Sequence, residues 1–284
     1  MNPLESARWT TIITPRRRWF DLDLLDLWRY RDLILLFAWR DMTALYKQTL
    51  LGPLWFALQP LAITIVFTIV FGRIAQIPTD GKPAFLFYFS GVVCWSYFAA
   101  NLVKTADTLV SNANIFGKVY FPRLTVPISV VISNLLQFAI QFCVLLCVLI
   151  WFSASGMPWQ FTWAVATLPL LLFQMAALGL GSGILVSALT TRYRDIAFVV
   201  GHGVQLWMFA TPVVYPLSQV PQRWQWVVAL NPMTAIVEGF RNALLGGEAP
   251  QFVHVLSSVA VTVLLLVCGL LLFARVERTF MDTV

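Results

Sequence analysis

The run Leu124–Thr191 contains no Asp, Glu, Lys or Arg over 68 consecutive positions. One helix that crosses a bilayer needs about 20 predominantly apolar residues, so this run is long enough for two crossings. Gly156 and Pro158 mark a turn between them, in the more polar stretch 153–160. The whole chain is 59% hydrophobic and 11% charged, whereas soluble domains are about 25% charged. The sequence therefore predicts a polytopic membrane protein.

Four further uncharged stretches bring the expected number of spans to six. We expect an all-α protein, because the alternating ten-residue segments of a membrane β-barrel are absent. The six expected spans are residues 54–73, 84–103, 124–152, 161–190, 196–215 and 253–274. A shorter apolar stretch, Trp224–Val237, cannot cross and is interrupted at Asn231-Pro232. We interpret it as short re-entrant or interfacial helices; the alternative is an ordinary loop with two tryptophans at the membrane interface.

The distribution of basic residues predicts the orientation. With six spans, both termini lie on the same side, and that side receives fifteen Lys and Arg residues against four on the other. This positive-inside bias places both termini in the cytoplasm and accounts for most of the net charge of +6, so we expect no nucleic-acid partner. The four outer residues are Arg73, Lys82, Arg223 and Arg241. The fifteen inner residues are Arg8, Arg16, Arg17, Arg18, Arg29, Arg31, Arg40, Lys47, Lys104, Lys118, Arg123, Arg192, Arg194, Arg275 and Arg278.

Two expected cytoplasmic segments are amphipathic. In residues 28–49, one helical face is apolar and aromatic and the other is mainly charged, as in helices that lie in a membrane surface. A soluble helix packed on a partner has the same pattern, but the direct continuation into an uncharged span favours the membrane surface. The apolar face comprises Trp28, Leu35, Trp39, Met42 and Tyr46; the polar face comprises Arg29, Asp32, Arg40, Thr43 and Lys47.

The second amphipathic segment, Lys104–Pro122, is expected to form one helix that Pro122 ends. It would lie on the membrane surface or contact a cytoplasmic partner. Its apolar face comprises Leu102, Ala106, Leu109, Ala113, Phe116 and Tyr120, and its polar face comprises Lys104, Asp107, Ser111, Asn114 and Lys118.

The sequence argues against an enzyme. It contains no GxxxxGK[ST], GxSxG or HExxH motif, so we expect no catalytic residue and no ATP hydrolysis by this chain. A membrane glycosyltransferase would need carboxylates in its loops, and the one candidate, Glu238 with Arg241, is explained as a surface pair one helical turn apart. Four cysteines without a CxxC and two separated histidines predict no metal site. An ion-coupled carrier is a rival, but the expected spans lack the ionisable residues of such carriers.

Four segments of the sequence are distinctive: WRDMTALYKQTLLGPLWFALQP (39–60), NANIFGKVYFPR (112–123), RYRDI (192–196) and LNPMTAIVEGFRNALLG (230–246). These segments resemble the membrane subunits of ABC-2 type exporters that move lipid-linked polysaccharides. They occur in family order, and the similarity covers about residues 30–275. The resemblance implies a homodimer bound to two copies of a separate ATPase subunit. ATP and Mg would be bound by that partner, with no cofactor in this chain.

The resemblance also implies roles for particular residues. In the family, the amphipathic helix and the loop between spans two and three contact the ATPase, which assigns coupling to Arg40, Lys47, Asp107, Lys118 and Arg123. The channel is bounded largely by spans one and five, which suggests Trp55, Phe56, Gln59, Trp207 and Tyr215 as lining residues.

Two more features bear on the pathway. Ser129, Ser133, Gln137 and Gln141 form a polar seam, so Gln137 and Gln141 are further channel candidates, or else contacts between helices. Gly179 and Gly183 form a GxxxG pattern that favours close helix packing. In the family, the segment between spans five and six forms short helices at the outer channel end. We therefore expect Trp224, Asn231, Pro232 and Glu238 at an outer gate, and Thr234 to be accessible from outside.

These expectations divide the chain into a cytoplasmic tail (1–27), an interface helix (28–49), a six-span transmembrane domain (50–275) and a second tail (276–284). The expected protein is a permease in the bacterial cytoplasmic (inner) membrane that exports a lipid-linked polysaccharide. O-antigen is the expected cargo. Capsule or teichoic-acid export by the same family and an ion-coupled carrier are the alternatives.

Overall fold

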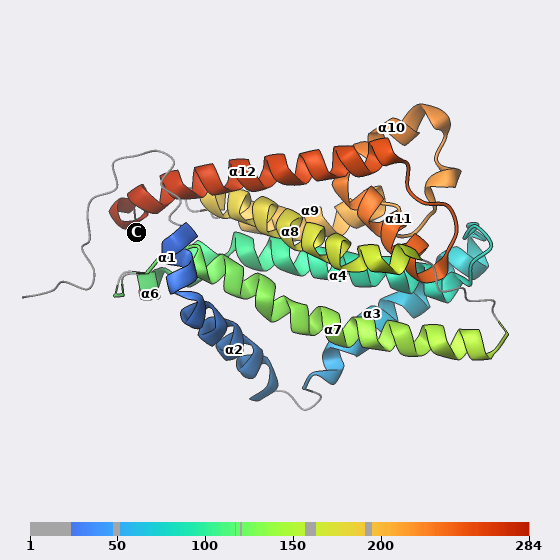
Figure 1. Cartoon of the computed structure of the whole chain (residues 1–284), viewed down its shortest axis with the longest axis horizontal. Coiled ribbons are helices and arrows are strands. Elements are labelled where there is room, and N and C mark those ends of the chain that lie inside the picture. The colour runs from blue at the N-terminus through green and yellow to red at the C-terminus, as the bar shows by residue number, and fades with distance from the viewer. Residues whose placement is uncertain are drawn as a thin grey trace, which may run out of the picture.

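The computed structural model describes residues 24–47, 52–116, 118–119, 121–156, 163–190 and 195–283, and every regular element in these ranges is a helix (Figure 1). The elements in chain order are α1 (Leu24–Arg29), α2 (Arg31–Lys47), α3 (Leu54–Phe67), the π-helix η1 (Thr68–Ile74), α4 (Ala84–Ala106), α5 (Thr108–Ser111), α6 (Ala113–Phe116), α7 (Thr125–Ala154), the 3₁₀-helix η2 (Trp163–Thr167), α8 (Leu168–Thr190), α9 (Ile196–Ala210), the 3₁₀-helix η3 (Leu217–Gln219), α10 (Gln222–Leu230), α11 (Pro232–Leu245) and α12 (Phe252–Thr283).

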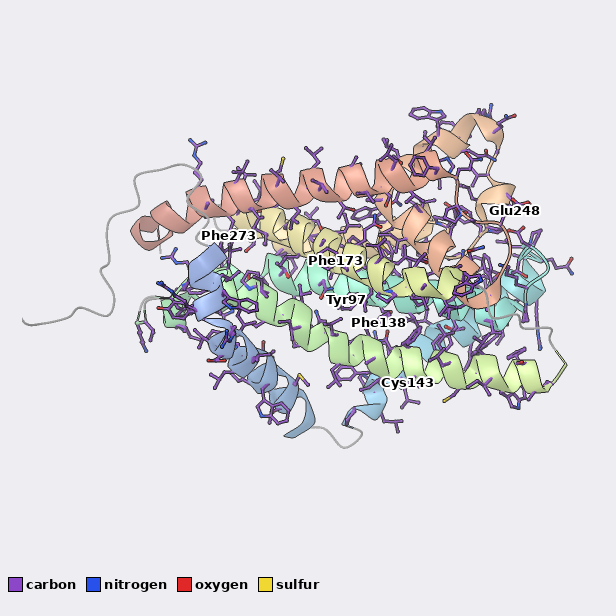
Figure 2. The ribbon with its side chains drawn as sticks, viewed as in Figure 1. Tyr97, Phe138, Cys143, Phe173, Glu248 and Phe273 are labelled. Atoms are coloured by element: carbon purple, nitrogen blue, oxygen red, sulfur yellow. The ribbon has the colours of Figure 1, made fainter. Side chains whose placement is uncertain are left out.

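Helix α4 is the centre of the fold. It packs against α3, α7, α8, α9 and α11, and most of its side chains are buried. Tyr97 on α4 contacts Phe138 on α7, with ring centroids 5.2 Å apart (Figure 2). The helices around α4 keep large apolar side chains exposed on their outer surfaces, such as Phe173 on α8 and Trp151 on α7. Extended exposed apolar surface of this kind marks a contact with a membrane or with another protein.

Five segments are long and apolar enough to cross a membrane, and they correspond to five of the six expected spans. They are Leu54–Ile74, Ala84–Ala106, Thr125–Ala154, Trp163–Thr190 and Phe252–Val276. The all-α, multi-pass prediction is therefore confirmed.

The remaining expected span, residues 196–215, is helical only as far as Ala210. Thr211 is extended (φ −101°, ψ 145°), as is usual for a residue before proline, and Pro212 follows it. At 15 residues, α9 is shorter than the roughly 17–25 residues of a typical spanning helix. That this segment crosses the membrane stays a prediction.

Glycines on both sides of α8 allow close contact with two neighbouring helices. A Cβ atom added at Gly179 or Gly183 would lie 2.6 Å from a Cβ of α4, that of Asn101 or Thr105. On the opposite side, a Cβ at Gly181 would lie 2.6 Å from the Cα of Leu266 in α12. The predicted packing role of the GxxxG pattern is confirmed, and a third glycine extends it to α12.

The helices of the bundle run along the long axis of the molecule and define two ends (Figure 1). One end carries α1, α6 and the C-terminal part of α12, and we call it the α6 end. The opposite end carries α10 and the start of α12, and we call it the α10 end. Phe273 and Glu248 lie toward these two ends, respectively (Figure 2).

The expectation of a single helix over 104–122 is wrong. Helix α4 ends at Ala106, and two four-residue helices, α5 and α6, follow. At the first break, the Thr105 carbonyl oxygen accepts hydrogen bonds from the Asp107 N–H and from Thr108 Oγ1 (2.7 Å), and these local bonds compete with the regular helix pattern. The predicted apolar side is nevertheless buried at Leu109 and Phe116, against protein rather than a membrane surface.

Candidate functional site

Helix α2 uses three faces rather than two. Ile34, Phe37 and Ala38 are buried, and the helix packs against α7, a face that sequence reasoning missed. Leu35 and Trp39, from the predicted apolar face, are 58% and 69% exposed. An apolar, aromatic surface left open beside charged residues is what an interfacial helix presents to lipid. The missed face follows the same helical period as the exposed one, so sequence alone does not say which apolar face contacts protein.

Arg40, a predicted coupling residue, is already engaged within α2. Its Nη2 and Nε atoms lie 2.8 and 2.9 Å from Oδ1 of Asp41, and its guanidinium group lies 4.9 Å from the Phe37 ring centroid. Lys47 is the last residue of α2, and its side chain lies outside the described residues.

The other predicted coupling residues lie around α5 and α6, near the α6 end. Asp107 and Lys118 are exposed, whereas Arg123 is half-buried with its guanidinium group 5.7 Å from the Phe116 ring centroid. The structure therefore offers two exposed charges of opposite sign to a partner at this end. Whether they contact an ATPase stays a prediction.

The predicted channel residues of α3 and α7 have different environments. Trp55 (56% exposed) and Gln59 are exposed on α3, and Phe56 is half-buried. Gln141 is buried, and its Nε2 donates to the Phe56 carbonyl oxygen at 3.2 Å, which links α7 to α3. Gln137 is half-buried on the same helix.

Trp207 and Tyr215 are both half-buried. The Trp207 ring packs edge-on against Phe98 and Trp95 of α4, with centroid distances of 5.3 and 6.0 Å. These contacts fix α9 on the central helix. The opposite side of α9 is open: among its residues only Val204 is buried, and a Cβ at Gly201 or Gly203 would meet no atom within 4 Å.

At the α10 end, Asn231 separates α10 from α11 as its dipeptide with Pro232 predicted. Its Oδ1 accepts a hydrogen bond from the Met233 N–H (3.1 Å) and caps α11, with Pro232 in the first turn. Its Nδ2 donates to Oγ1 of Thr211 (2.8 Å), which ties the bend to the end of α9. Two short helices are thus present, and their dipping into a membrane stays a prediction.

The expectation that Thr234 is accessible is wrong. Thr234 has no exposed surface, because it lies on the inner face of α11 and its hydroxyl donates to the Val228 carbonyl oxygen at 2.6 Å. Trp224 and Trp226 on α10 are 53% and 67% exposed. The accessible surface of this region is therefore α10 rather than α11.

Arg241 is not part of a surface pair, which corrects the interpretation of Glu238 and Arg241. Arg241 is 5% exposed and donates to three backbone carbonyl oxygens: those of Phe87 (3.2 Å), Pro212 (2.5 Å) and Val213 (2.6 Å). It is buried because α11 packs against α4, so the helix side that carries residue 241 faces protein. One side chain thus holds α11, α4 and the segment after α9 together.

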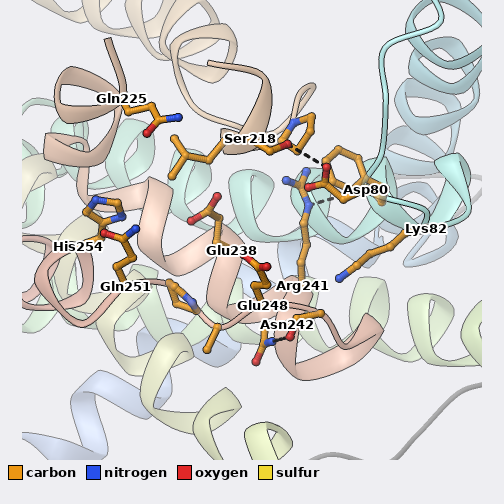
Figure 3. Close-up of a pocket in the computed structure, with 16 residues that line it drawn as sticks. Asp80, Lys82, Ser218, Gln225, Glu238, Arg241, Asn242, Glu248, Gln251 and His254 are labelled. Atoms are coloured by element: carbon orange, nitrogen blue, oxygen red, sulfur yellow. Dashed lines mark hydrogen bonds between the residues drawn. The ribbon is translucent and has the colours of Figure 1, made fainter. Parts of the chain in front are cut away.

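A pocket of 580 Å³ opens beside Arg241 (Figure 3). Its walls come from the loop before α4, the segment 216–218, α10, α11 and the connection into α12. Two contacts hold the wall: Ser218 Oγ donates to Asp80 Oδ1 at 2.8 Å, and Asn242 Nδ2 donates to the Gly247 carbonyl oxygen at 2.7 Å. The charged and polar lining residues are Asp80, Lys82, Ser218, Gln225, Glu238, Arg241, Asn242, Glu248, Gln251 and His254.

The pocket changes the acidity of its charged groups. Burial raises the pKa of the Glu238 carboxyl to about 7, against the opposing effect of the Arg241 charge. Burial also lowers the pKa of Lys82, and the neighbouring charge of Arg241 adds to this effect. Sequence reasoning placed Glu238 at the outer end but missed Asp80, Lys82 and Glu248 as its neighbours, because they come from separate loops.

Comparison with known proteins identifies the family. Residues 32–245 match the sequence profile of the ABC-2 type transporter family. The chain belongs to the ABC-2 type transporter family. This ABC-2 protein is 25% identical over 252 residues to the O-antigen export system permease protein RfbA of Klebsiella pneumoniae, covering 88% of this chain and 94% of the relative. It is 26% identical over 261 residues to the protein of that name from Myxococcus xanthus, covering 91% and 98%.

Proposed function

We propose that this ABC-2 protein is the permease subunit of an exporter that moves lipid-linked O-antigen across the bacterial cytoplasmic membrane. The observation that carries the proposal is its full-length similarity to permeases named for O-antigen export, which spans 88–91% of this chain. The bundle of spanning helices supports a pathway through the bilayer. The α6 end would face the cytoplasm, in line with the distribution of basic residues.

The active unit would be a homodimer with two copies of a separate ATPase subunit that binds ATP and Mg. Support for a dimer comes from the open side of α9. No other described part of the chain covers the backbone at Gly201 and Gly203, and the polar ring of His202 is exposed between apolar segments of the same helix. Small residues allow close helix contact in membranes. Support for a separate ATPase comes from the sequence, which has no phosphate-binding loop.

Gene deletion followed by analysis of the cell-surface glycan tests the cargo. We expect loss of long-chain O-antigen from the surface, accumulation of lipid-linked glycan inside, and recovery on complementation. Loss of a capsule or teichoic acid instead would assign that polymer, and an unchanged surface would refute export. A second measurement tests the motor: the purified chain should hydrolyse no ATP until a P-loop subunit is added.

A further inference from the structure

The cations at the pocket of the α10 end are already occupied by backbone carbonyl oxygens. The guanidinium group of Arg241 donates to three of them, and the Lys82 ammonium group donates to the carbonyl of Gly246. These charges hold the walls of the pocket in place. An anionic ligand such as phosphate would have to compete with those bonds, and it would also meet the carboxylates of Asp80, Glu238 and Glu248.

The groups that remain are carboxylates and neutral polar side chains that can accept hydrogen bonds. Within the part of the chain that the structure describes, no cation lies at ion-pair distance from the Glu238 carboxylate. Glu248 and Gln251 are exposed at the rim. Nδ1 of His254, in the same wall, is buried without a partner in the described residues. Acceptors arranged around a cavity suit a ligand that brings many donors.

We propose that this pocket binds a neutral sugar residue of the exported glycan, whose hydroxyl groups donate to Glu238, Glu248 and Gln251. A saccharide has the required chemistry because it carries several hydroxyl donors and no charge. The volume of 580 Å³ lies within the roughly 300–1,000 Å³ of small-ligand sites. The inference rests on the proposed export function for the origin of the sugar, and the position of the pocket at the α10 end would let it hold the glycan as it leaves.

Binding to the full-length protein in lipid nanodiscs tests the pocket. The probes are an oligosaccharide released by mild acid from the host's surface glycan, its component monosaccharides, and inorganic phosphate. Saturation-transfer NMR or calorimetry at pH 8 is suitable, because Glu238 is then ionised. We expect saturable oligosaccharide binding, with monosaccharides weaker and phosphate unable to compete.

Two variants and a matched control locate the site. Glu238→Gln should weaken oligosaccharide binding about tenfold, because it removes a charged acceptor without changing the size of the side chain. Gln251→Leu should weaken it about three- to tenfold. Gln222→Leu makes the same change at an exposed position of α10 outside the pocket lining and should leave binding unchanged. Size-exclusion profiles establish that each variant is folded.

The possible outcomes separate this inference from the proposed export function. The pocket assignment is overturned if the wild-type protein shows no saturable binding up to about 10 mM oligosaccharide, if both pocket variants bind normally, or if phosphate displaces the sugar. Binding of monosaccharides alone would overturn the link to the glycan. Loss of surface O-antigen on gene deletion without any sugar binding would leave export standing and remove the pocket. Specific sugar binding with an unchanged cell surface would leave the pocket standing and refute the export function.

Discussion

The guanidinium carbon of Arg241 lies 3.6 Å from the centroid of the Phe87 ring, so a buried cation on α11 stacks directly on the central helix α4. Gly91, one turn further along α4, makes room for this contact: a Cβ there would lie 2.7 Å from Nη2 of Arg241. The stacked ring and the three carbonyl acceptors together explain how the positive charge of Arg241 is stabilised at a position that solvent barely reaches. Arg241 therefore acts as a clamp on the α10 end.

Replacing Arg241 with Met should lower the free energy of unfolding by about 3 kcal/mol or more. The change keeps much of the side-chain volume but removes the donor to the carbonyl oxygens of Pro212 and Val213, and each buried unsatisfied group costs roughly 1–3 kcal/mol. The Phe87 carbonyl keeps its bond from Ser90 Oγ at 3.0 Å. The measurement is the thermal midpoint of the detergent-solubilised protein. Arg223→Met, an exposed change on α10, is the control. Equal midpoints for the two variants would show that Arg241 is not a structural clamp.

Gly183→Ala should separate α8 from α4 and destabilise the protein by about 1–3 kcal/mol. The new methyl group would lie 2.6 Å from Thr105 Cβ and 2.9 Å from the Leu102 carbonyl oxygen, so a helix has to move. In the monomeric protein, where no second copy covers α9, Gly201→Ala adds the same methyl group in open space and should be neutral or stabilise by up to about 1 kcal/mol. Thermal unfolding of both variants checks this, and a neutral Gly183→Ala would exclude close contact between α4 and α8.

The sequence was sufficient to predict those features that depend only on the order of residues along the chain. Uncharged runs located five long spans, Asn231-Pro232 located the bend, and the GxxxG spacing indicated a packed face. The burial of Arg241 and Thr234 was missed because α11 carries them on the side that meets α4, and only the tertiary fold decides which side that is. The break at Asp107 was missed because local bonds to the Thr105 carbonyl oxygen, from the Asp107 N–H and the Thr108 hydroxyl, interrupt the helical period.

The pocket was not predictable from sequence for a different reason. Its wall residues come from segments far apart in the chain, as Asp80, Glu238 and Glu248 illustrate. Each alone is an ordinary loop or helix-surface acid in the sequence. Only the packing of α11 and the start of α12 beside the loop before α4 brings them together.

Lys118→Glu should reduce glycan export without reducing insertion of the protein into the membrane. Lys118 is an exposed charge near the α6 end, where the proposed ATPase would bind, so reversing its sign should weaken that contact. The measurements are surface O-antigen and co-purification of the ATPase subunit. Arg223→Glu reverses an exposed charge on α10, near the opposite end, and should leave both unchanged. Normal export by Lys118→Glu would remove this residue from the coupling surface.

Glu238 should make the protein less stable as the pH rises from about 4.5 to about 7. Burial raises its pKa from 4.5 to about 7, so in this range the folded state binds more protons than the unfolded state. The free energy of unfolding therefore falls with rising pH by roughly 3 kcal/mol, and this component is constant above pH 7. The charge of Asp80 adds to this upward pKa shift, and the charge of Arg241 opposes it.

Thermal midpoints from pH 4.5 to 8 measure this dependence. Glu238→Gln should flatten the fall between pH 5 and 7, because the amide does not titrate. Glu248→Gln, an exposed carboxylate at the rim of the same pocket, should keep the wild-type profile. If the Glu238→Gln profile matches that of the wild type, another group is responsible for the fall.

A cysteine at position 248 should react from outside the cell with a membrane-impermeant thiol reagent. Glu248 is exposed at the α10 end, in contrast to the buried Thr234, and it lies opposite the α6 end, which we propose faces the cytoplasm. The native cysteines Cys94, Cys143, Cys147 and Cys268 must first be replaced. Lys118→Cys in the same background should react only after permeabilisation. The reverse pattern would invert the membrane orientation, and with it the placement of the ATPase contact at the α6 end and of the sugar pocket at the exit.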